Sequence, residues 1–207
     1  MPSKIVIGIE PWLSMALEDW SIAEPLVKLV PIAVEIDKNY LFKFPNLNDY
    51  SPNESSVFVA WGAEFLNFQR LELFGEFKKR GFKMPPLIHP TSLVSSSAKI
   101  QENVWLHAFT SIGSNSIIEY NSCISFSSKV FNNVIVQRNS WVGERVIIQQ
   151  GARIGANSIL GNSINVLCNV NVGRQVRIEI TGTIDKDITD KSFHIQASGL
   201  CGRIIRI

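Results

Sequence analysis

The feature that most constrains the fold is a six-residue repeat of aliphatic side chains between residues 88 and 178. The repeat is unbroken, because Ile, Val or Leu occupies each of sixteen positions six residues apart. A helix repeats every 3.6 residues or so and a strand every 2, and neither produces this period. A six-residue period is typical of a parallel β-helix, in which each hexad supplies a short strand and a corner. The positions are Ile88, Val94, Ile100, Leu106, Ile112, Ile118, Ile124, Val130, Val136, Val142, Ile148, Ile154, Leu160, Val166, Val172 and Ile178.

Two further patterns keep the same phase. The residues two places before the aliphatic positions are mostly small or β-branched, which suits a narrow interior. Asparagine tolerates left-handed backbone better than most residues, so a repeated asparagine marks a repeated tight corner. With three hexads to a turn, we predict roughly five turns of coil. The asparagines that stand three places after an aliphatic position are Asn103, Asn115, Asn121, Asn133, Asn139, Asn157 and Asn169.

The residues that precede the repeat alternate apolar strands with helical segments. We predict strands at residues 4–9, 30–36 and 57–61, helices over about 13–29 and 63–80, and a loop rich in Asn, Asp and Pro over 40–56. This order predicts a small parallel α/β domain. The chain is therefore expected to form two domains, residues 1–86 and residues 87–207, the second ending in a turn-rich tail and a closing segment.

Composition excludes several classes of function. The chain has 20 Lys and Arg against 18 Asp and Glu, a net charge of +2, which is no electrostatic footprint for nucleic acid. Within the repeat, basic residues outnumber acidic ones. This excess of positive charge either suits an anionic ligand or is ordinary surface charge. Three widely spaced cysteines argue against a disulfide framework or a metal site. Because neither a secretory signal nor an apolar run of about 18 residues is visible, we expect a cytoplasmic protein without a membrane span.

Nearly the whole chain resembles a known family in order and spacing. Residues 87–92 (LIHPTS) stand where sialic-acid O-acetyltransferases and bacillosamine N-acetyltransferases have an Ile-His-Pro-Ser-Ala phrase, and residues 59–62 (VAWG) with Arg70 look like their third strand and following helix. The resemblance implies a fold that is α/β plus β, with a Rossmann-like domain followed by a left-handed parallel β-helix. Left-handed crossovers break the usual rule, so the handedness comes from the resemblance alone. It also implies a homotrimer, an acyl-CoA co-substrate (most simply acetyl-CoA) and a nucleotide-sugar.

In active relatives, a glycine-rich turn after the first strand holds the nucleotide. Here Gly8 is the only glycine of that turn, and Glu10 and Pro11 follow it. Glu10 would repel a phosphate and Pro11 lacks an N–H donor. Trp12 is a candidate for stacking on the nucleotide, and the other interpretation is that it is a core or interface residue. The substrate-binding candidates implied by the resemblance are Gly8, Trp12, Asp37 and Gly62.

The family's general base is a histidine two places after an aliphatic residue. Asn132, followed by Asn133, occupies that place, and an amide orients groups by hydrogen bonding but accepts no proton near neutral pH. Trp141 stands at another position where the family often has histidine. The cofactor-binding candidates implied by the resemblance are Trp141, Gly143, Gly151, Gly161 and Gly182.

These altered signatures leave three hypotheses open. In the first, a neutral sugar amine attacks the thioester without a protein base, and Asn132 and backbone amides orient the reaction. In the second, the base has shifted to His107, which a coil surface could present to a cleft; the other interpretation of His107 is an outward corner residue. In the third, the protein is a catalytically silent trimeric coil with a binding or scaffolding role.

Large apolar residues replace small polar ones in several hexads of the repeat. They fit a trimer interface, or they fit the lining of an acyl or sugar pocket. We favour an acetyl-CoA-dependent N-acetyltransferase of a nucleotide-linked amino sugar in bacterial surface-glycan synthesis, with the silent trimeric protein as the alternative. The large apolar residues are Trp105, Phe109, Phe126, Phe131 and Trp141.

Overall fold

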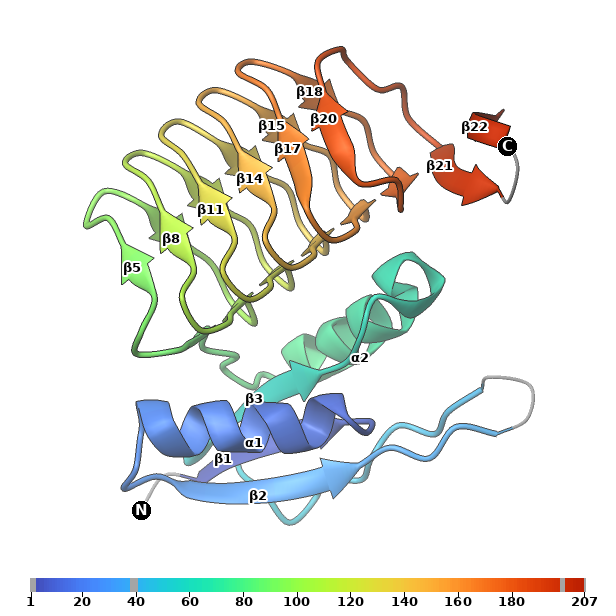
Figure 1. Ribbon diagram of the computed structural model, residues 1–207. Coiled ribbons are helices and arrows are strands. Elements are labelled where there is room, and N and C mark those ends of the chain that lie inside the picture. The colour runs from blue at the N-terminus through green and yellow to red at the C-terminus, as the bar shows by residue number, and fades with distance from the viewer. Residues whose placement is uncertain (1–2, 38–40, 198–199, 207) are drawn as a thin grey trace.

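The computed structural model describes the backbone of residues 3–37, 41–197 and 200–206, and places a small α/β unit against one side of a long coil (Figure 1). In the α/β unit, β1 (Ser3–Gly8) lies between β2 (Lys28–Ala33) and β3 (Ser55–Ala60), and both pairings are parallel. Helix α1 (Trp12–Ala23) connects β1 to β2. The 3₁₀ turn η1 (Glu64–Asn67) and helix α2 (Phe68–Lys79) follow β3. The three predicted strands and two predicted helices are present, with the first helix ending earlier than expected.

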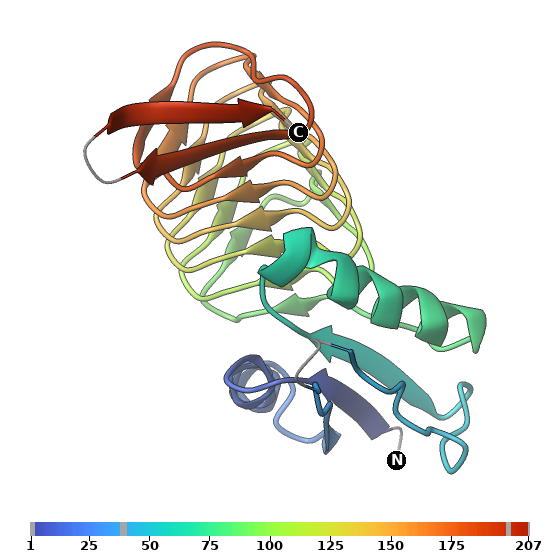
Figure 2. The ribbon, with the colours of Figure 1, turned by 90° about the vertical axis from the view of Figure 1, so that its right-hand side faces the viewer.

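From Leu87 the chain winds through about six turns, whose short strands stack into three parallel sheets (Figure 2). Sheet 1 contains β4 (Leu87–Ile88), β7 (Trp105–Leu106), β10 (Cys123–Ile124), β13 (Trp141–Val142), β16 (Ile159–Leu160) and β19 (Arg177–Ile178). Sheet 2 contains β5 (Leu93–Val94), β8 (Ser111–Ile112), β11 (Lys129–Val130), β14 (Ile147–Ile148), β17 (Ile164–Val166) and β20 (Gly182–Ile184). Sheet 3 contains β6 (Lys99–Ile100), β9 (Ile117–Ile118), β12 (Ile135–Val136), β15 (Arg153–Ile154) and β18 (Asn171–Val172).

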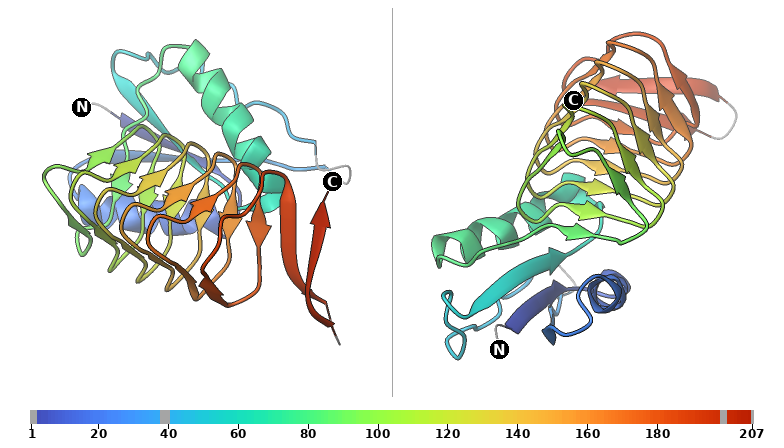
Figure 3. Two further views of the ribbon diagram at one scale, coloured as in Figure 1. Left: turned by 90° about the horizontal axis from the view of Figure 1, so that it is seen from above. Right: turned by 90° about the vertical axis from the view of Figure 1, so that its left-hand side faces the viewer.

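The end of the chain extends sheet 1. Strand β21 (Ser192–Ala197) pairs with β19 in parallel and with β22 (Leu200–Arg206) in antiparallel, so the predicted closing segment is a hairpin. This hairpin lies at the far end of the coil, beyond the strands of sheet 1 that the α/β unit covers (Figure 3). Residues 198–199 and 207 of that segment lie outside the described residues.

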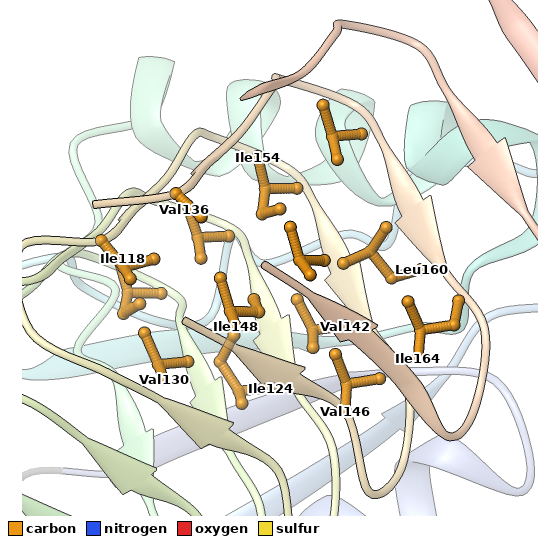
Figure 4. Packing of buried hydrophobic residues seen from close by; sticks show 14 of the residues in the cluster. Ile118, Ile124, Val130, Val136, Val142, Val146, Ile148, Ile154, Leu160 and Ile164 are labelled. Atoms are coloured by element: carbon orange, nitrogen blue, oxygen red, sulfur yellow. The ribbon is translucent and has the colours of Figure 1, made fainter. Parts of the chain in front are cut away.

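The coil interior confirms the six-residue period. All sixteen aliphatic positions belong to one hydrophobic cluster, fully buried except for Ile88, Val94 and Ile100, which are partly buried in the first turn. Figure 4 shows members of this cluster gathered inside the coil, with Ile124, Val142 and other labelled side chains packed together. Because burying one such side chain stabilises a fold by roughly 1.5–3 kcal/mol, this column is the main source of the coil's stability.

The corners confirm the asparagine pattern and add a second role for it. All seven predicted corner asparagines have positive φ, between 51° and 61°. Four of them also form a ladder along one corner. In it the side-chain amide of Asn103 donates to Asn121, that of Asn121 to Asn139 and that of Asn139 to Asn157, with N···O distances of 2.7, 2.6 and 2.7 Å. The ladder ties four successive turns together where their backbones bend.

The α/β unit covers the outer face of sheet 1. The outward residues of five successive strands pack into one cluster with residues of β1, α1 and β3, including Val6, Leu13, Trp20 and Phe58. The tail of the coil continues beyond this covered area. The outward residues that the α/β unit covers are Leu87, Trp105, Cys123, Trp141 and Ile159.

Within the described residues, no helix is long and apolar enough to cross a membrane. Nor does the described part of the chain bring together three His, Cys, Asp or Glu side chains in an arrangement that could hold a metal ion.

Candidate functional site

A cleft, here called the Trp12 cleft, separates the α/β unit from the upper part of sheet 1. Its volume of about 800 Å³ lies within the range usual for small-molecule sites. It opens beside Gly62, just after the carboxyl end of β3, and parallel α/β sheets bind their ligands at the carboxyl ends of their strands. The lining residues are Trp12, Ala63, Glu64, Leu66, Phe68, Trp141, Arg177 and Phe193.

Trp12 and Trp141 bring the two parts of the protein together at this cleft. Trp12 is the first residue of α1, and Trp141 is the outward residue of β13. Their ring centroids lie 4.9 Å apart with the planes at 75°, an edge-to-face contact. A residue expected to bind substrate and one expected to bind cofactor therefore lie in a single site. Trp12 also acts as an interface residue, because it touches Trp105, with 6.4 Å between ring centroids.

The two glycines among the substrate-binding candidates are needed for different structural reasons. At Gly62, a Cβ atom would lie 2.4 Å from Trp12 Nε1 and 2.5 and 2.6 Å from the Glu64 carboxylate oxygens, so the glycine leaves room for both polar groups at the cleft. At Gly8, a Cβ atom would lie 1.9 Å from the Ala60 carbonyl oxygen, so this glycine permits the close approach of β1 and β3.

Asp37 lies apart from these residues. Its side chain is exposed, and its Oδ1 accepts the backbone N–H of Leu41 at 2.9 Å. It lines a separate hollow formed by the end of β2 and residues 41–46, and it does not line the Trp12 cleft. The structure thus does not bring all four substrate candidates together.

Asn132 lines a shallower hollow on sheet 2, with a volume of about 440 Å³. Its Oδ1 accepts the backbone N–H of Ser114 at 2.8 Å, so the side chain caps the neighbouring turn. Within the described residues its Nδ2 has no hydrogen-bond partner, and the hollow that Asn132 lines also includes Lys129 and the half-exposed Phe131. Asn133 follows with φ of 58° and forms the corner.

The cofactor glycines are spread over two corners of the coil. The Gly151 N–H donates to the Asn132 carbonyl at 3.1 Å, so Gly151 belongs to the Asn132 corner. Gly143 and Gly161 stack at the corner between sheets 1 and 2, where a Cβ on Gly143 would lie 2.7 Å from the Gly161 carbonyl carbon. Gly182 is exposed at the start of β20, with φ of 140°. Of these four glycines, Gly151 alone therefore lies beside Asn132.

The expectation that a surface presents His107 to a cleft is wrong. The side chain is only 1% exposed and lies between Trp105 and Phe126, with ring centroids 4.1 and 4.5 Å away. Burial, reinforced by the positive charge of Arg70, lowers the pKa of His107 to about 3. The reason is that the α/β unit covers this corner of sheet 1, and the covered ring cannot reach a substrate.

Sequence reasoning missed Glu64, Phe68 and Arg177, which line the cleft, and it did not predict that Arg70 and Cys123 are buried nearby. Arg70 is fully buried, its Nη2 donates to the Asn103 carbonyl at 3.1 Å, and burial lowers its pKa to about 10. Beside it, burial raises the pKa of the Cys123 thiol to about 12, so Cys123 is no nucleophile. Glu64 and Phe68 could have been found, because they follow the carboxyl end of a parallel strand. Arg177 carried no local signal, because it comes from the far end of the coil.

The fold and the cleft define a class: parallel β-solenoid proteins of the hexapeptide-repeat type that carry a small α/β unit docked on the coil. Searches against protein-family models and curated proteins found no match. Solved structures do match. The acetyltransferase domain of PglB from Neisseria gonorrhoeae FA1090 has a TM-score of 0.80 and 21% identity over 94% of this chain and 96% of its own. PerB from Caulobacter crescentus, in complex with CoA and GDP-perosamine, has a TM-score of 0.79 and 23% identity over 98% of this chain and 97% of its own.

A third solved structure is more distant. WeeI from Acinetobacter baumannii AYE has a TM-score of 0.55 and 15% identity, over 98% of this chain and 99% of its own. At these identities the likeness is one of fold, and it covers both the α/β unit and the coil.

Proposed function

We propose that this protein is an acetyl-CoA-dependent N-acetyltransferase whose acceptor is the amino group of a nucleotide-linked sugar. The observation that carries the proposal is the match of both structural parts in one alignment, with a TM-score of 0.80 over 94% of the chain. The matching proteins include a PglB acetyltransferase domain in complex with acetyl coenzyme A and a GDP-perosamine N-acetyltransferase in complex with CoA and GDP-perosamine. Bacterial surface-glycan synthesis in the cytoplasm is the proposed setting.

The finer architecture is part of this proposal. We infer a left-handed coil for residues 87–207 and a Rossmann-like domain for residues 1–86. The strand order β2-β1-β3, with α1 crossing between parallel strands, supports the second assignment.

In this reading the Trp12 cleft holds the nucleotide-sugar, since its aromatic walls suit a flat base or a sugar face. The acetyl thioester lies at the Asn132 hollow. The amine nitrogen attacks the thioester carbon, the carbonyl oxygen becomes an oxyanion, and the free Nδ2–H of Asn132 donates to it. The C–S bond then breaks, and the departing thiolate takes the proton from the new amide nitrogen. A neutral amine needs no protein base for this sequence.

In a homotrimer, the Trp12 cleft of one subunit would lie close to the Asn132 hollow of its neighbour. The Trp12 cleft lies over sheet 1 and the Asn132 hollow lies over sheet 2, and they share no lining residue. Apolar side chains stand exposed on sheet 2 and its corners, including Leu93 (74%), Phe109 (67%) and Phe131 (48%). A neighbouring copy packed against this face would bury them and bring its own cleft toward Asn132.

The proposal is tested by acetyl transfer to a panel of nucleotide-linked amino sugars, with Asn132→Ala compared with Asn162→Ala. Asn162 is the matched control, because its Oδ1 caps the Glu144 N–H at 2.8 Å as Asn132 caps Ser114, but it lies outside the hollow. Loss of one oxyanion donor should lower kcat about 100- to 1,000-fold in Asn132→Ala, while Asn162→Ala stays close to wild type.

Equal losses in the two variants would show that the centre is misplaced. One observation favours the silent-protein alternative: within the described residues, no histidine lines either hollow. That alternative is supported if wild-type protein transfers no acetyl group and its melting temperature is unchanged by millimolar acetyl-CoA. A ligand present at about 100 times its Kd should stabilise the native state by about 2.7 kcal/mol.

A further inference from the structure

We propose that the Trp12 cleft selects guanine, and that Glu64 and Trp12 read the edge of the base. This inference rests on the proposed function, because it names the nucleotide of the sugar donor that the cleft holds. It starts from a polar pair that the acetyl-transfer chemistry leaves unused.

The pair consists of the Glu64 carboxylate and the Trp12 indole N–H. Both converge on the space that a Gly62 side chain would fill, with Nε1 at 2.4 Å and the two carboxylate oxygens at 2.5 and 2.6 Å from the position of a Cβ there. Neither group has a hydrogen-bond or ion-pair partner within the part of the chain that the structure describes. By contrast, the carboxylate of Glu102 is paired, with its Oε1 2.8 Å from Lys78 Nζ.

The pair presents one donor beside two acceptors, because an indole N–H only donates and a carboxylate only accepts. Guanine offers the complementary order along its Watson–Crick edge: the O6 acceptor, the N1–H donor and the N2 amino donor. Uracil places its single N–H between two acceptors, and adenine offers an amino donor beside an acceptor nitrogen. Either base would leave a carboxylate oxygen facing an acceptor.

The rest of the cleft suits a base attached to phosphates. Trp141 and the half-exposed Phe68 provide apolar walls, and stacking on aromatic rings accepts any base, so selection must come from the polar edge. Arg177 also lines the cleft and bonds Glu179 through its Nε at 2.6 Å. It places a guanidinium where a diphosphate leaving the cleft would pass.

The test is calorimetry of the full chain with GDP, IDP, UDP and ADP, none of which carries an amino sugar. GDP should bind at least tenfold more tightly than UDP or ADP. IDP, which lacks the N2 amino group, should bind more weakly than GDP. Glu64→Gln keeps the size of the side chain but replaces one acceptor by a donor, and it should weaken GDP binding 10- to 100-fold and remove the preference for GDP over IDP. Glu72→Gln, on the exposed face of α2, is the control and should match wild type.

Equal affinity for GDP, UDP and ADP would overturn the inference, as would GDP binding that Glu64→Gln leaves unchanged. If Glu64→Gln weakens only a nucleotide that carries an amino sugar, the carboxylate holds the sugar ammonium and the guanine assignment is wrong. Acetyl transfer to an amino sugar on another nucleotide would reject guanine selection while leaving the proposed function standing. Absence of binding by every nucleotide and by acetyl-CoA would reject both.

Discussion

Acidification should weaken the contact between the α/β unit and the coil, and His107 should be the residue responsible. Its ring is 1% exposed, and neither nitrogen has a hydrogen-bond partner within the described residues. The nearest acid is Asp19 of α1, whose Oδ2 lies 3.6 Å from Nδ1 but bonds the Trp105 indole at 2.8 Å. A protonated imidazole would therefore be a buried charge without a dedicated partner.

The size and sign of the effect follow from proton linkage. The pKa of His107 is lowered from 6.5 in the unfolded chain to about 3 in the folded protein, so the unfolded chain binds the proton first as the pH falls. The contribution of the neutral ring to stability is complete above pH 6.5 and is lost as the pH falls toward 3. Near pH 4.5, about 2 units below the unfolded pKa, the loss is about 2.7 kcal/mol. For a chain of this size it corresponds to a fall in Tm of about 5–10 °C.

Other groups that face His107 modify this value. The charges of Arg70 and His89 both disfavour the imidazolium and so add to the acid sensitivity. Asp19 acts in the opposite direction, because burial raises its pKa and the folded state then gains stability as the carboxylate takes up a proton. Comparison with a variant that keeps Asp19 separates the two effects.

The assay is urea unfolding near pH 7 and near pH 4.5 for wild type and His107→Phe. Phenylalanine keeps an aromatic ring between Trp105 and Phe126 but cannot titrate. The stability lost between the two pH values should be about 2.5 kcal/mol smaller in the variant than in wild type. Equal losses would refute the reasoning, and so would a wild-type His107 NMR signal that titrates near pH 6.5 in the folded protein.

Two further predictions concern the coil, and both are measured by urea unfolding at neutral pH. Ile124→Ala opens a cavity in the interior column and should cost about 2–5 kcal/mol, whereas Ile117→Ala, on the outer face of sheet 3, should cost much less. Asn121→Ala interrupts the buried ladder and leaves amide groups without partners, so it should cost about 1–3 kcal/mol more than Asn115→Ala. Asn115 shares the φ of 58° but lies outside the ladder, so equal costs would show that backbone conformation alone explains these asparagines.

The interior of the coil could be predicted because its cause is local. The backbone within each hexad determines which side chain points inward, so the six-residue period in the sequence directly identifies the core residues. The corner asparagines were predictable for the same reason, since left-handed backbone is a property of one residue and its neighbours. Their side-chain ladder was missed because it joins residues 18 apart in the sequence, which become adjacent only when three hexads close a turn.

The burial of His107 was missed although the sequence carries a signal for it. The residue before each aliphatic position points outward, and along one sheet these residues recur every 18 positions. On sheet 1 they include Trp105, Cys123 and Trp141, all buried, whereas Lys129 on sheet 2 and Arg153 on sheet 3 are exposed. Reading every third hexad would have identified the face that the preceding domain covers, and with it the corner that hides His107.

The same row of residues explains where the Trp12 cleft lies. Trp12 contacts Trp141, and seven residues later Asp19 bonds Trp105, two coil turns below. Seven helical residues advance about 10.5 Å, and two turns of paired strands rise about 9.6 Å, so the helix and the row stay in register along the face. Helix α1 begins at Trp12, but the row continues past Trp141 to Arg177 and Phe193. The cleft therefore opens at the first residue of α1, where the coil extends beyond the helix, beside the carboxyl ends of β1 and β3.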